Sequence, residues 1–174
     1  MITKNDLILD IPHESGMNFD ELISLGNFIQ REKPKRILEI GTKYGRTTIN
    51  MAKFAPEDCE IVSVDLIPLD YSFVYKYPES KKIKFIQGDS LKFDFSKLGY
   101  FDVVLVDANH LYNFVQNDTK IALNSVKQDG YILWHDYGKV GPQYSKIQVK
   151  QALDDMKIKP DMYLGWSLVG LQIR

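Results

Sequence analysis

Short apolar runs alternate along the chain with longer segments in which apolar residues recur at helical spacing. The short runs are rich in β-branched and aromatic residues, which favour strands over helices. Strands and helices in regular alternation are typical of a parallel sheet that is covered by helices on both faces. The pattern therefore predicts the α/β class, with a Rossmann-like, doubly wound sheet.

Four segments are predicted to be helical. The first begins after Asn18, whose side chain can cap the helix while Glu21 completes a capping box, and Pro34 ends it. The second spans residues 45–54, and the third spans residues 112–127, with Gly130 as its C-terminal cap. The last is built on apolar positions at helical spacing and ends before Pro160; these positions are Val149, Ala152, Leu153 and Met156.

Seven strands are predicted, at residues 36–40, 60–64, 83–87, 101–106, 131–134, 162–166 and 168–173. Residues 101–106 are apolar on both faces after Asp102, as a strand in the middle of a parallel sheet should be. Residues 66–82 contain prolines and aromatics that fit neither period, which indicates a loop with room for one helical turn. Without repeats or linkers, we expect one domain over residues 1–174, with 1–18 as an N-terminal cap segment.

Composition limits the partners and the compartment. The 22 basic residues nearly cancel the 23 acidic ones, so no net field would attract nucleic acid or an anionic membrane, and a small-molecule partner is favoured. A single cysteine, Cys59, excludes an internal disulfide and a multi-cysteine zinc site. No signal peptide and no apolar run of roughly 20 residues is present, so a soluble, cytoplasmic protein is expected.

Polar or glycine residues follow five of the predicted strands. They are Gly41, Asp65, the triplet Gly88, Asp89 and Ser90, then Asp107, and the pair His135 and Asp136. In an open α/β sheet the carboxyl ends of the strands meet at one edge, and ligands bind there. The sequence therefore predicts a pocket at this edge. His110 belongs to the same edge, whereas His13 precedes the first helix and is expected at the surface.

The turn after the first strand separates two classes of ligand. A glycine turn followed by Asp65 after the next strand suits both a dinucleotide and S-adenosylmethionine, because each has a ribose whose hydroxyls a carboxylate can accept. A pyrophosphate needs G-x-G-x-x-G, but Lys43 and Arg46 stand where the second and third glycines belong. The looser spacing of Gly41 and Gly45 favours S-adenosylmethionine, and an NAD-dependent oxidoreductase is the weaker alternative.

The turn EIGTKYGRTT (residues 39–48) resembles the first motif of class I S-adenosylmethionine-dependent methyltransferases. Two later segments are more specific: VDANHLY (residues 106–112) and GYILWHDY (residues 130–137), with Asp118 between them, resemble the D-x-x-H-x-Y, D and G-x-I-x-x-H-D-Y series of the methyltransferase 24 family. Asp118 is expected to make a structural contact and is left out of the predicted site. The resemblance covers roughly residues 20–155. It implies a sheet with strand order 3-2-1-4-5-7-6 in which strand seven is antiparallel.

The same resemblance implies a set of cofactor contacts for S-adenosylmethionine. The methionine part would lie against the first turn, the second motif acid would bind the ribose, and an Asp-Ser pair would border the adenine. The cofactor residues so assigned are Glu39, Gly41, Thr42, Gly45, Asp65, Asp89, Ser90 and Asp107. The chain departs from the family where the fuller first motif has a middle glycine. Lys43, Tyr44 and Arg46 near this turn are expected to be solvated residues at the start of a helix.

The residues that could carry the reaction are Asp107, His110 and Asp136. Methyl transfer to a hydroxyl needs a base or a metal ion, and imidazole accepts protons at neutral pH, as the matching histidine of related sugar O-methyltransferases is proposed to do. Asp107 and Asp136 should end adjacent strands, and two carboxylates suit Mg²⁺. However, the Asp-Asn pair of catechol O-methyltransferase corresponds here to Asp136 and Tyr137, so one metal ligand is missing.

The sequence thus predicts a methyltransferase that acts on a hydroxyl of a small molecule, with His110 as base, Asp107 beside it, and Mg²⁺ assistance left open. A different class, an accessory module that binds the cofactor without catalysis, remains an alternative. Only residues 1–18 and 66–82 are available to cover the acceptor, so a second copy of the chain in a homodimer could complete the wall of the acceptor pocket. The sequence does not name the acceptor.

Overall fold

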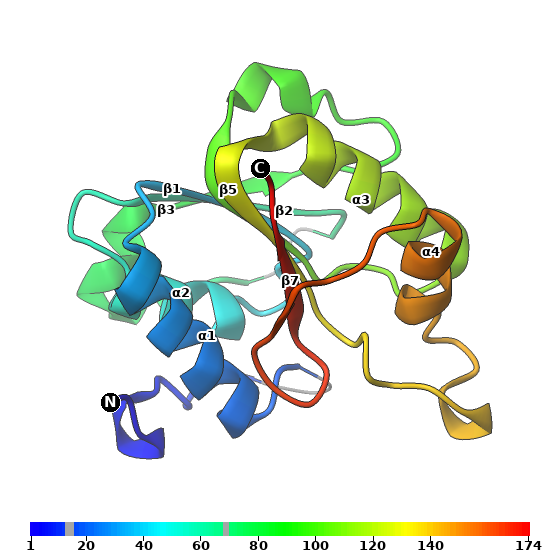
Figure 1. Ribbon diagram of the computed structural model, residues 1–174. Helices are drawn as coiled ribbons and strands as arrows, with labels where there is room; N and C mark the ends of the chain where they lie inside the picture. The colour runs from blue at the N-terminus through cyan, green and yellow to red at the C-terminus, as the bar shows by residue number, and fades with distance from the viewer. Residues whose placement is uncertain (13–15, 68–69) are drawn as a thin grey trace.

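The computed structural model describes residues 1–12, 16–67 and 70–174 (Figure 1). Its strands form one seven-stranded sheet in the order β3-β2-β1-β4-β5-β7-β6. They are β1 (Arg36–Ile40), β2 (Glu60–Asp65), β3 (Ile83–Gln87), β4 (Phe101–Val106), β5 (Val126–Trp134), β6 (Met162–Tyr163) and β7 (Val169–Gln172). β1 to β5 pair in parallel, whereas β7 is antiparallel to both β5 and β6. The predicted class, strand order and antiparallel strand are confirmed.

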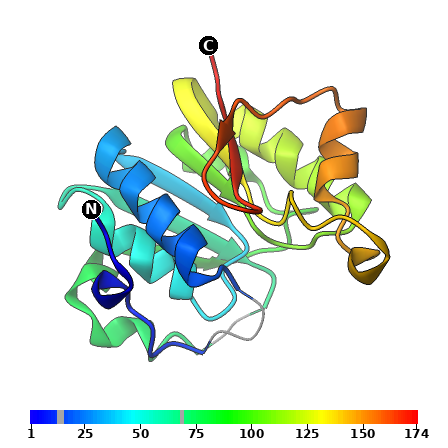
Figure 2. The same ribbon diagram turned by 60° about the horizontal axis from the view of Figure 1, so that its bottom comes forward.

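Among the described residues, four α-helices cover the two faces of the sheet: α1 (Phe19–Glu32), α2 (Arg46–Phe54), α3 (Tyr112–Ser125) and α4 (Val149–Asp155). α1 and α2 lie on one face, and α3 and α4 lie on the other (Figures 1 and 2). The predicted capping box is present at the start of α1, where Asn18 Oδ1 accepts from the Glu21 amide and the Glu21 carboxylate accepts from the Asn18 amide, each at 3.0 Å. None of these helices combines the length and apolarity that a membrane crossing requires.

The strands are apolar on both faces because each face contributes to a separate core. In β1, Ile37 packs with the α1 and α2 side, while its neighbour Leu38 packs with the α3 and α4 side. This alternation follows from the two-residue period of a strand. β4 lies between β1 and β5, as its apolar sequence predicted.

The prediction that Gly130 caps the third helix is wrong. α3 ends at Ser125, and the β-branched Val126 already pairs with Phe101 as the first residue of β5. The pairing then shifts register, so that Val103 pairs with Tyr131. Gly130 lies inside this irregular stretch, where an added Cβ would come within 2.9 Å of the Asp102 carbonyl oxygen. Gly130 therefore allows β4 and β5 to approach closely, and it does not cap a helix.

Two segments differ in detail from the prediction. The described part of the 66–82 loop contains two short 3-10 helices, Val74–Lys76 and Pro78–Lys82, where one turn was expected. The closing strands β6 and β7 are shorter than residues 162–166 and 168–173. The last helix ends at Asp155 and thus before Pro160, as predicted.

The N-terminal segment packs against the first core. Its apolar side chains are buried, namely Ile2, Leu7, Ile8, Ile11 and Met17. The Asn50 side chain on α2 accepts from the Ile8 amide and donates to the Ile8 carbonyl, each at 2.9 Å. These two bonds fix the path of the segment toward the carboxyl edge of the sheet. His13, expected at the surface, lies outside the described residues.

Candidate functional site

The turn between β1 and α2 is held in an unusual backbone shape. Gly41, Lys43 and Gly45 all have positive φ, at 101°, 48° and 80°. Asp65 at the end of β2 stabilises the turn, because its Oδ2 accepts from the amides of Thr42 and Lys43 at 2.8 Å each. Asp65, the predicted cofactor acid, therefore fixes the shape of the turn through Oδ2. Its other oxygen, Oδ1, accepts from the Ile67 amide in the next loop at 3.1 Å.

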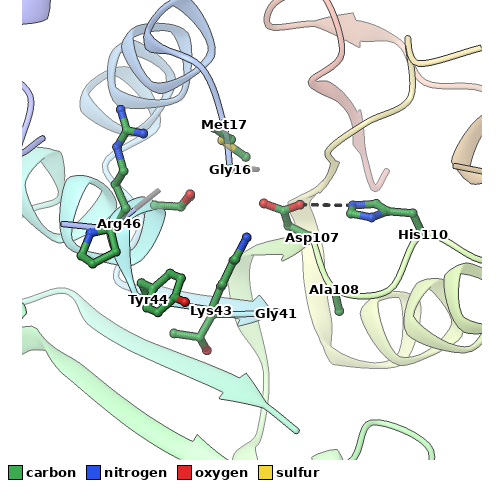
Figure 3. A pocket seen from close by; sticks show the side chains of 12 residues that line it. Gly16, Met17, Gly41, Lys43, Tyr44, Arg46, Asp107, Ala108 and His110 are labelled. Carbon is green, nitrogen blue, oxygen red and sulfur yellow. Dashed lines mark ion pairs between the residues drawn. The ribbon is translucent and has the colours of Figure 1, made fainter. Parts of the chain in front are cut away.

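Two cavities open at this edge of the sheet and share Gly41 and Ala108 as a common wall. The first, of about 280 Å³, lies below the N-terminal segment and is drawn in Figure 3; its lining includes Pro12, Gly16, Met17, Thr42, Lys43, Tyr44, Arg46, Asp107 and His110. The second, of about 200 Å³, lies over β2 and β3; its lining includes Val64, Asp65, Gly88, Asp89, Ser90, Asn109, Phe114 and Asp118. The two cavities therefore lie next to each other along the sheet edge.

Glu39 is fully buried in β1, just below the turn. Its Oε2 accepts hydrogen bonds from the hydroxyls of Thr48 and Ser63, while Oε1 has no partner among the described residues. Burial, with the charges of Asp107 and Asp65 added, raises the pKa of Glu39 to about 8 despite those two hydrogen bonds. Glu39 thus keeps one buried oxygen that no described residue satisfies.

Glu39→Gln should make the ligand-free protein less sensitive to pH. The folded-state pKa of Glu39, about 8, lies above the ordinary unfolded value, so its stabilising contribution is complete below roughly pH 4.3 and is lost as the pH rises through 8. Glutamine cannot ionise, so the free energy of unfolding of the variant should fall less between pH 6 and pH 9, as measured by urea denaturation. Asp20→Asn, an exposed change on α1, should keep the wild-type difference, and an equal fall in Glu39→Gln would contradict the prediction.

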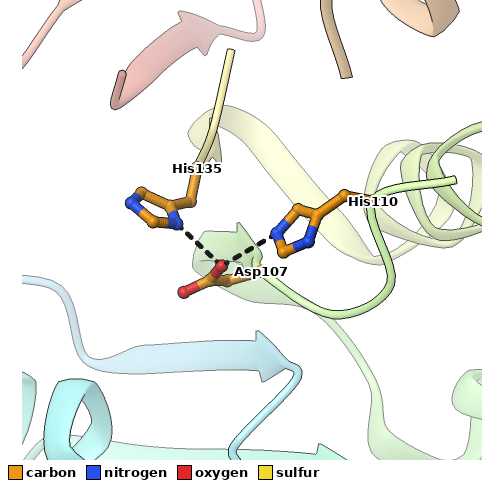
Figure 4. Close-up of side chains that lie close together, drawn as sticks. All are labelled: Asp107, His110 and His135. Atoms are coloured by element: carbon orange, nitrogen blue, oxygen red, sulfur yellow. Dashed lines mark hydrogen bonds and ion pairs between the residues drawn. The ribbon is translucent and has the colours of Figure 1, made fainter. Parts of the chain in front are cut away.

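Asp107, at the end of β4, lies between His110 and His135 (Figure 4). Its Oδ1 lies 2.9 Å from His135 Nδ1 and 3.6 Å from His110 Nε2, and Asp136 Oδ2 lies 3.2 Å from the same His110 nitrogen. Burial alone would raise the pKa of Asp107, but the charge of His135, the hydrogen bond with it and the nearby imidazole of His110 lower the pKa to about 2. The strand ends therefore bring together Asp107, His110 and Asp136, as the strand pattern predicted.

A buried chain of polar groups extends behind Asp107. His135 Nε2 lies 3.2 Å from Glu21 Oε2 on α1, and the Ser167 hydroxyl donates to the other Glu21 oxygen. Burial lowers the pKa of His135, but the Asp107 and Glu21 carboxylates outweigh it and raise the pKa to about 10. Burial would raise the pKa of Glu21, yet its bonds with His135 and Ser167 bring it to about 2.

Glu21 and Ser167 were not among the predicted site residues. One signal was available for Glu21, because it shares the buried face of α1 with Leu22 and Leu25, where an unpaired carboxylate would be costly. Ser167 had no such signal, since it lies 146 residues from Glu21 and meets it only through the fold.

Arg46 and Asp118 also differ from what the sequence suggested. The expectation of a solvated Arg46 is wrong: the residue is 8% exposed, and its guanidinium lies 5.4 Å from the centre of the Phe19 ring. Figure 3 shows its guanidinium turned away from Lys43 and Asp107. Asp118 was left out of the site, yet it lines the second cavity, is 1% exposed, and has no partner for Oδ2 within the described part of the chain. Burial raises the pKa of Asp118.

The part of the sequence that forms the glycine turn and the polar strand ends matches a known family of enzymes. The family model for methyltransferase domains called methyltransferase 24 matches residues 38–137, which is more than half of the chain. The chain belongs to this family. It is a class I S-adenosylmethionine-dependent methyltransferase. No curated protein matches its sequence significantly.

Solved structures of methyltransferases have the same fold. The O-methyltransferase TomG from Streptomyces achromogenes, in complex with S-adenosylmethionine, is 17% identical, with a TM-score of 0.70 over 91% of this chain and 82% of its own. The Podospora anserina methyltransferase PaMTH1, bound to S-adenosylhomocysteine, is 20% identical, with a TM-score of 0.73 over 92% and 80%. MycE of the mycinamycin pathway, in complex with Mg, S-adenosylhomocysteine and mycinamycin VI, is 18% identical, with a TM-score of 0.64 over 92% and 51%.

The residues predicted as functional fall into three places in this methyltransferase. Gly41, Thr42, Asp107 and His110 line the first cavity, and Asp65, Asp89 and Ser90 line the second. Three others stand just outside both linings: Glu39 lies below the turn, Gly45 caps the start of α2, and Asp136 lies behind His110. The cofactor set and the candidate catalytic set thus occupy one continuous edge of the sheet.

Proposed function

We propose that this methyltransferase transfers the methyl group of S-adenosylmethionine to a hydroxyl oxygen of a small molecule, with His110 as the base. The observation that carries the proposal is the position of His110 Nε2, which faces two carboxylates beside the first cavity and lacks a hydrogen-bond partner among the described residues. A buried polar atom without a partner costs about 1–3 kcal/mol. An acceptor hydroxyl that donates to Nε2 removes that cost.

The carboxyl edge of the sheet offers side chains that suit the groups of S-adenosylmethionine. Asp65 and Asp89 give the second cavity carboxylates that can accept from ribose hydroxyls, while Val64 and Phe114 give it apolar walls for adenine. In β1, just before the turn, Glu39 Oε1 has no hydrogen-bond partner among the described residues and is a polar group that a bound cofactor can satisfy. The bound cofactor supplies an electrophilic methyl group on a sulfonium.

The chain's own part in the reaction is alignment and proton removal. Methyl transfer is an in-line displacement, so the acceptor oxygen must be held in the first cavity and must lose its proton as the new bond forms. His110 Nε2 takes this proton, and the Asp107 and Asp136 carboxylates, at 3.6 and 3.2 Å, stabilise the resulting imidazolium. The low pKa of Asp107, about 2, keeps its charge in place at neutral pH.

The direct test is product analysis with labelled cofactor. Purified enzyme, S-adenosylmethionine with a trideuterated methyl group, and separate panels of sugars, phenols, amines and thiols would be incubated and analysed by mass spectrometry. We expect S-adenosylhomocysteine to accumulate with a hydroxylated acceptor, and the label to appear in an ether. Transfer only to nitrogen or sulfur would contradict O-methylation.

Asp118 is proposed to accept from the exocyclic amino group of adenine. Its Oδ2 is buried, unpartnered in the described structure, and part of the wall of the second cavity. Asp118→Ala should weaken binding of S-adenosylhomocysteine by about 10-fold or more, since a hydrogen bond to a charged group contributes about 1.5–3 kcal/mol. Calorimetry would measure this, with Asn124→Ala, an exposed change on the same helix, as the control.

An analogue with hypoxanthine in place of adenine makes the test specific. The analogue lacks the amino group, so wild type should bind it more weakly than S-adenosylhomocysteine, whereas Asp118→Ala should not distinguish the two. A variant that still discriminates by the wild-type factor would exclude this role of Asp118.

A further inference from the structure

A divalent cation at this site would need the carboxylates of Asp107 and Asp136 as ligands, because Mg²⁺ prefers anionic oxygens. Both carboxylates already face basic side chains of the same chain. Asp107 Oδ1 lies 2.9 Å from His135 Nδ1, and Asp136 Oδ1 lies 2.5 Å from Lys139 Nζ and 3.3 Å from the same His135 nitrogen. One oxygen of each carboxylate that could hold a cation thus already faces basic groups from within the fold.

The geometry around His135 makes it a cation. Its two ring nitrogens lie within hydrogen-bond distance of two different carboxylates, Asp107 at 2.9 Å and Glu21 at 3.2 Å. An ionised carboxylate can only accept hydrogen bonds, so both ring nitrogens must donate, and only the imidazolium form carries a proton on each. His135 is 3% exposed, so this charge is fixed in the interior rather than at the surface.

Glu21 and Ser167 hold the ring in this position. Glu21 accepts from Ser167 through one oxygen and lies against His135 through the other, and it is itself fixed by the capping box with Asn18. A metal ion that entered between Asp107 and Asp136 would therefore have to expel an imidazolium held from both sides. Removing one partner of a buried ion pair is costly, because it leaves the other charge uncompensated in the interior.

We propose that the His135 imidazolium and the Lys139 ammonium take the place of a divalent cation at Asp107 and Asp136, so that this enzyme transfers methyl groups without a metal ion. The inference rests on the proposed function, since it concerns how the same acceptor oxygen is activated. With no ion to polarise that oxygen, proton removal falls to His110, and Glu21 acts as a positioning residue that reaches the site through His135.

The same cluster offers a second set of metal-ligating atoms. Ligand atoms of Asp107, His110 and His135 all lie within 4.8 Å of one another, and a carboxylate with two imidazoles suits transition metals such as Mn²⁺ or Zn²⁺. An ion bound in that way would need His135 to give up the bonds to Glu21 and Asp107. The experiment must therefore include these ions as well as Mg²⁺.

The test is ion binding to the wild-type protein in the presence of S-adenosylhomocysteine. Electron paramagnetic resonance would follow Mn²⁺, and calorimetry would follow Mg²⁺ and Zn²⁺. We expect no binding of any of the three with a Kd below about 1 mM, and an unchanged methyl transfer rate after EDTA treatment. Tighter binding at a single site that Asp107→Asn removes, or a rate that EDTA abolishes and Mg²⁺ restores, would overturn the proposal.

A double variant tests whether the positive charge at His135 is what excludes a metal ion. In Glu21→Gln/His135→Glu the imidazolium is replaced by a third carboxylate, and the glutamine removes the charge that would repel it. We expect this variant to gain Mn²⁺ binding if it retains S-adenosylhomocysteine binding, and a folded variant that binds no Mn²⁺ would contradict the proposal. If the variant does not fold, the wild-type titrations still decide. These titrations need no acceptor, so a failure of methyl transfer alone would count against the proposed function.

Discussion

His110→Ala is expected to lower kcat by about 10²- to 10⁴-fold, the usual contribution of a positioned general base. The loss should be confined to catalysis. The His110 side chain is 30% exposed, and its Nε2 makes no hydrogen bond within the described structure, so little packing or bonding is removed. S-adenosylhomocysteine release in steady state would measure kcat, and calorimetry should show nearly unchanged cofactor binding.

Chemical rescue separates a base from a structural role. Added imidazole can diffuse into the space that alanine leaves and accept the proton, so part of the lost rate should return in a concentration-dependent way. Asn113→Ala, an exposed change near the start of α3, is the matched control and should keep wild-type turnover with or without imidazole. Wild-type turnover in His110→Ala would exclude His110 as the base.

The fold could be predicted because its determinants are local. β4 is apolar on both faces and ends in Asp107, so its place in the middle of the sheet and the direction of its polar end follow from its own six residues. The end of α3 did not follow in this way. Val126 leaves the helix because Phe101 offers it a partner on β4, and that pairing is invisible in the segment itself.

The same distinction explains the site. Asp107 and His110 are three residues apart, and Asp136 follows the neighbouring strand, so strand order alone brings them together. Glu21 is 114 residues from His135, and its capping role at α1, which the sequence did predict, gives no hint of a second partner. Long-range polar contacts of this kind depend on how α1 packs over the sheet edge.

The outline of the cavities was likewise beyond the sequence. The N-terminal cap segment was expected, but its use as a wall depends on its path, which Asn50 fixes by bonding to Ile8. Pro12 and Met17 then line the first cavity, opposite the glycine turn. The burial of Arg46 has the same origin, because Phe19 at the start of α1 covers its guanidinium.

Gly41→Ala should be the most damaging single change at the glycine turn. Gly41 has φ of 101°, a conformation that L side chains rarely adopt, and its added Cβ would lie 2.3 Å from the Asp107 carbonyl oxygen. Backbone strain of this kind costs about 1–3 kcal/mol, and overpacking adds about 1–3 kcal/mol. The free energy of unfolding should therefore fall by about 2–6 kcal/mol, measured by urea denaturation.

The change should also abolish cofactor binding, because Gly41 and Ala108 form the wall that both cavities share. To relieve the clash, the ends of β1 and β4 must separate, which moves Asp107 together with the turn. Gly165→Ala is the control: its Cβ would meet Glu21 Cγ at 3.4 Å, an ordinary van der Waals contact, so stability and binding should stay close to wild type. A Gly41→Ala protein with wild-type stability and wild-type S-adenosylhomocysteine affinity would contradict this prediction. It would show that the ends of β1 and β4 can separate without disturbing the cofactor site.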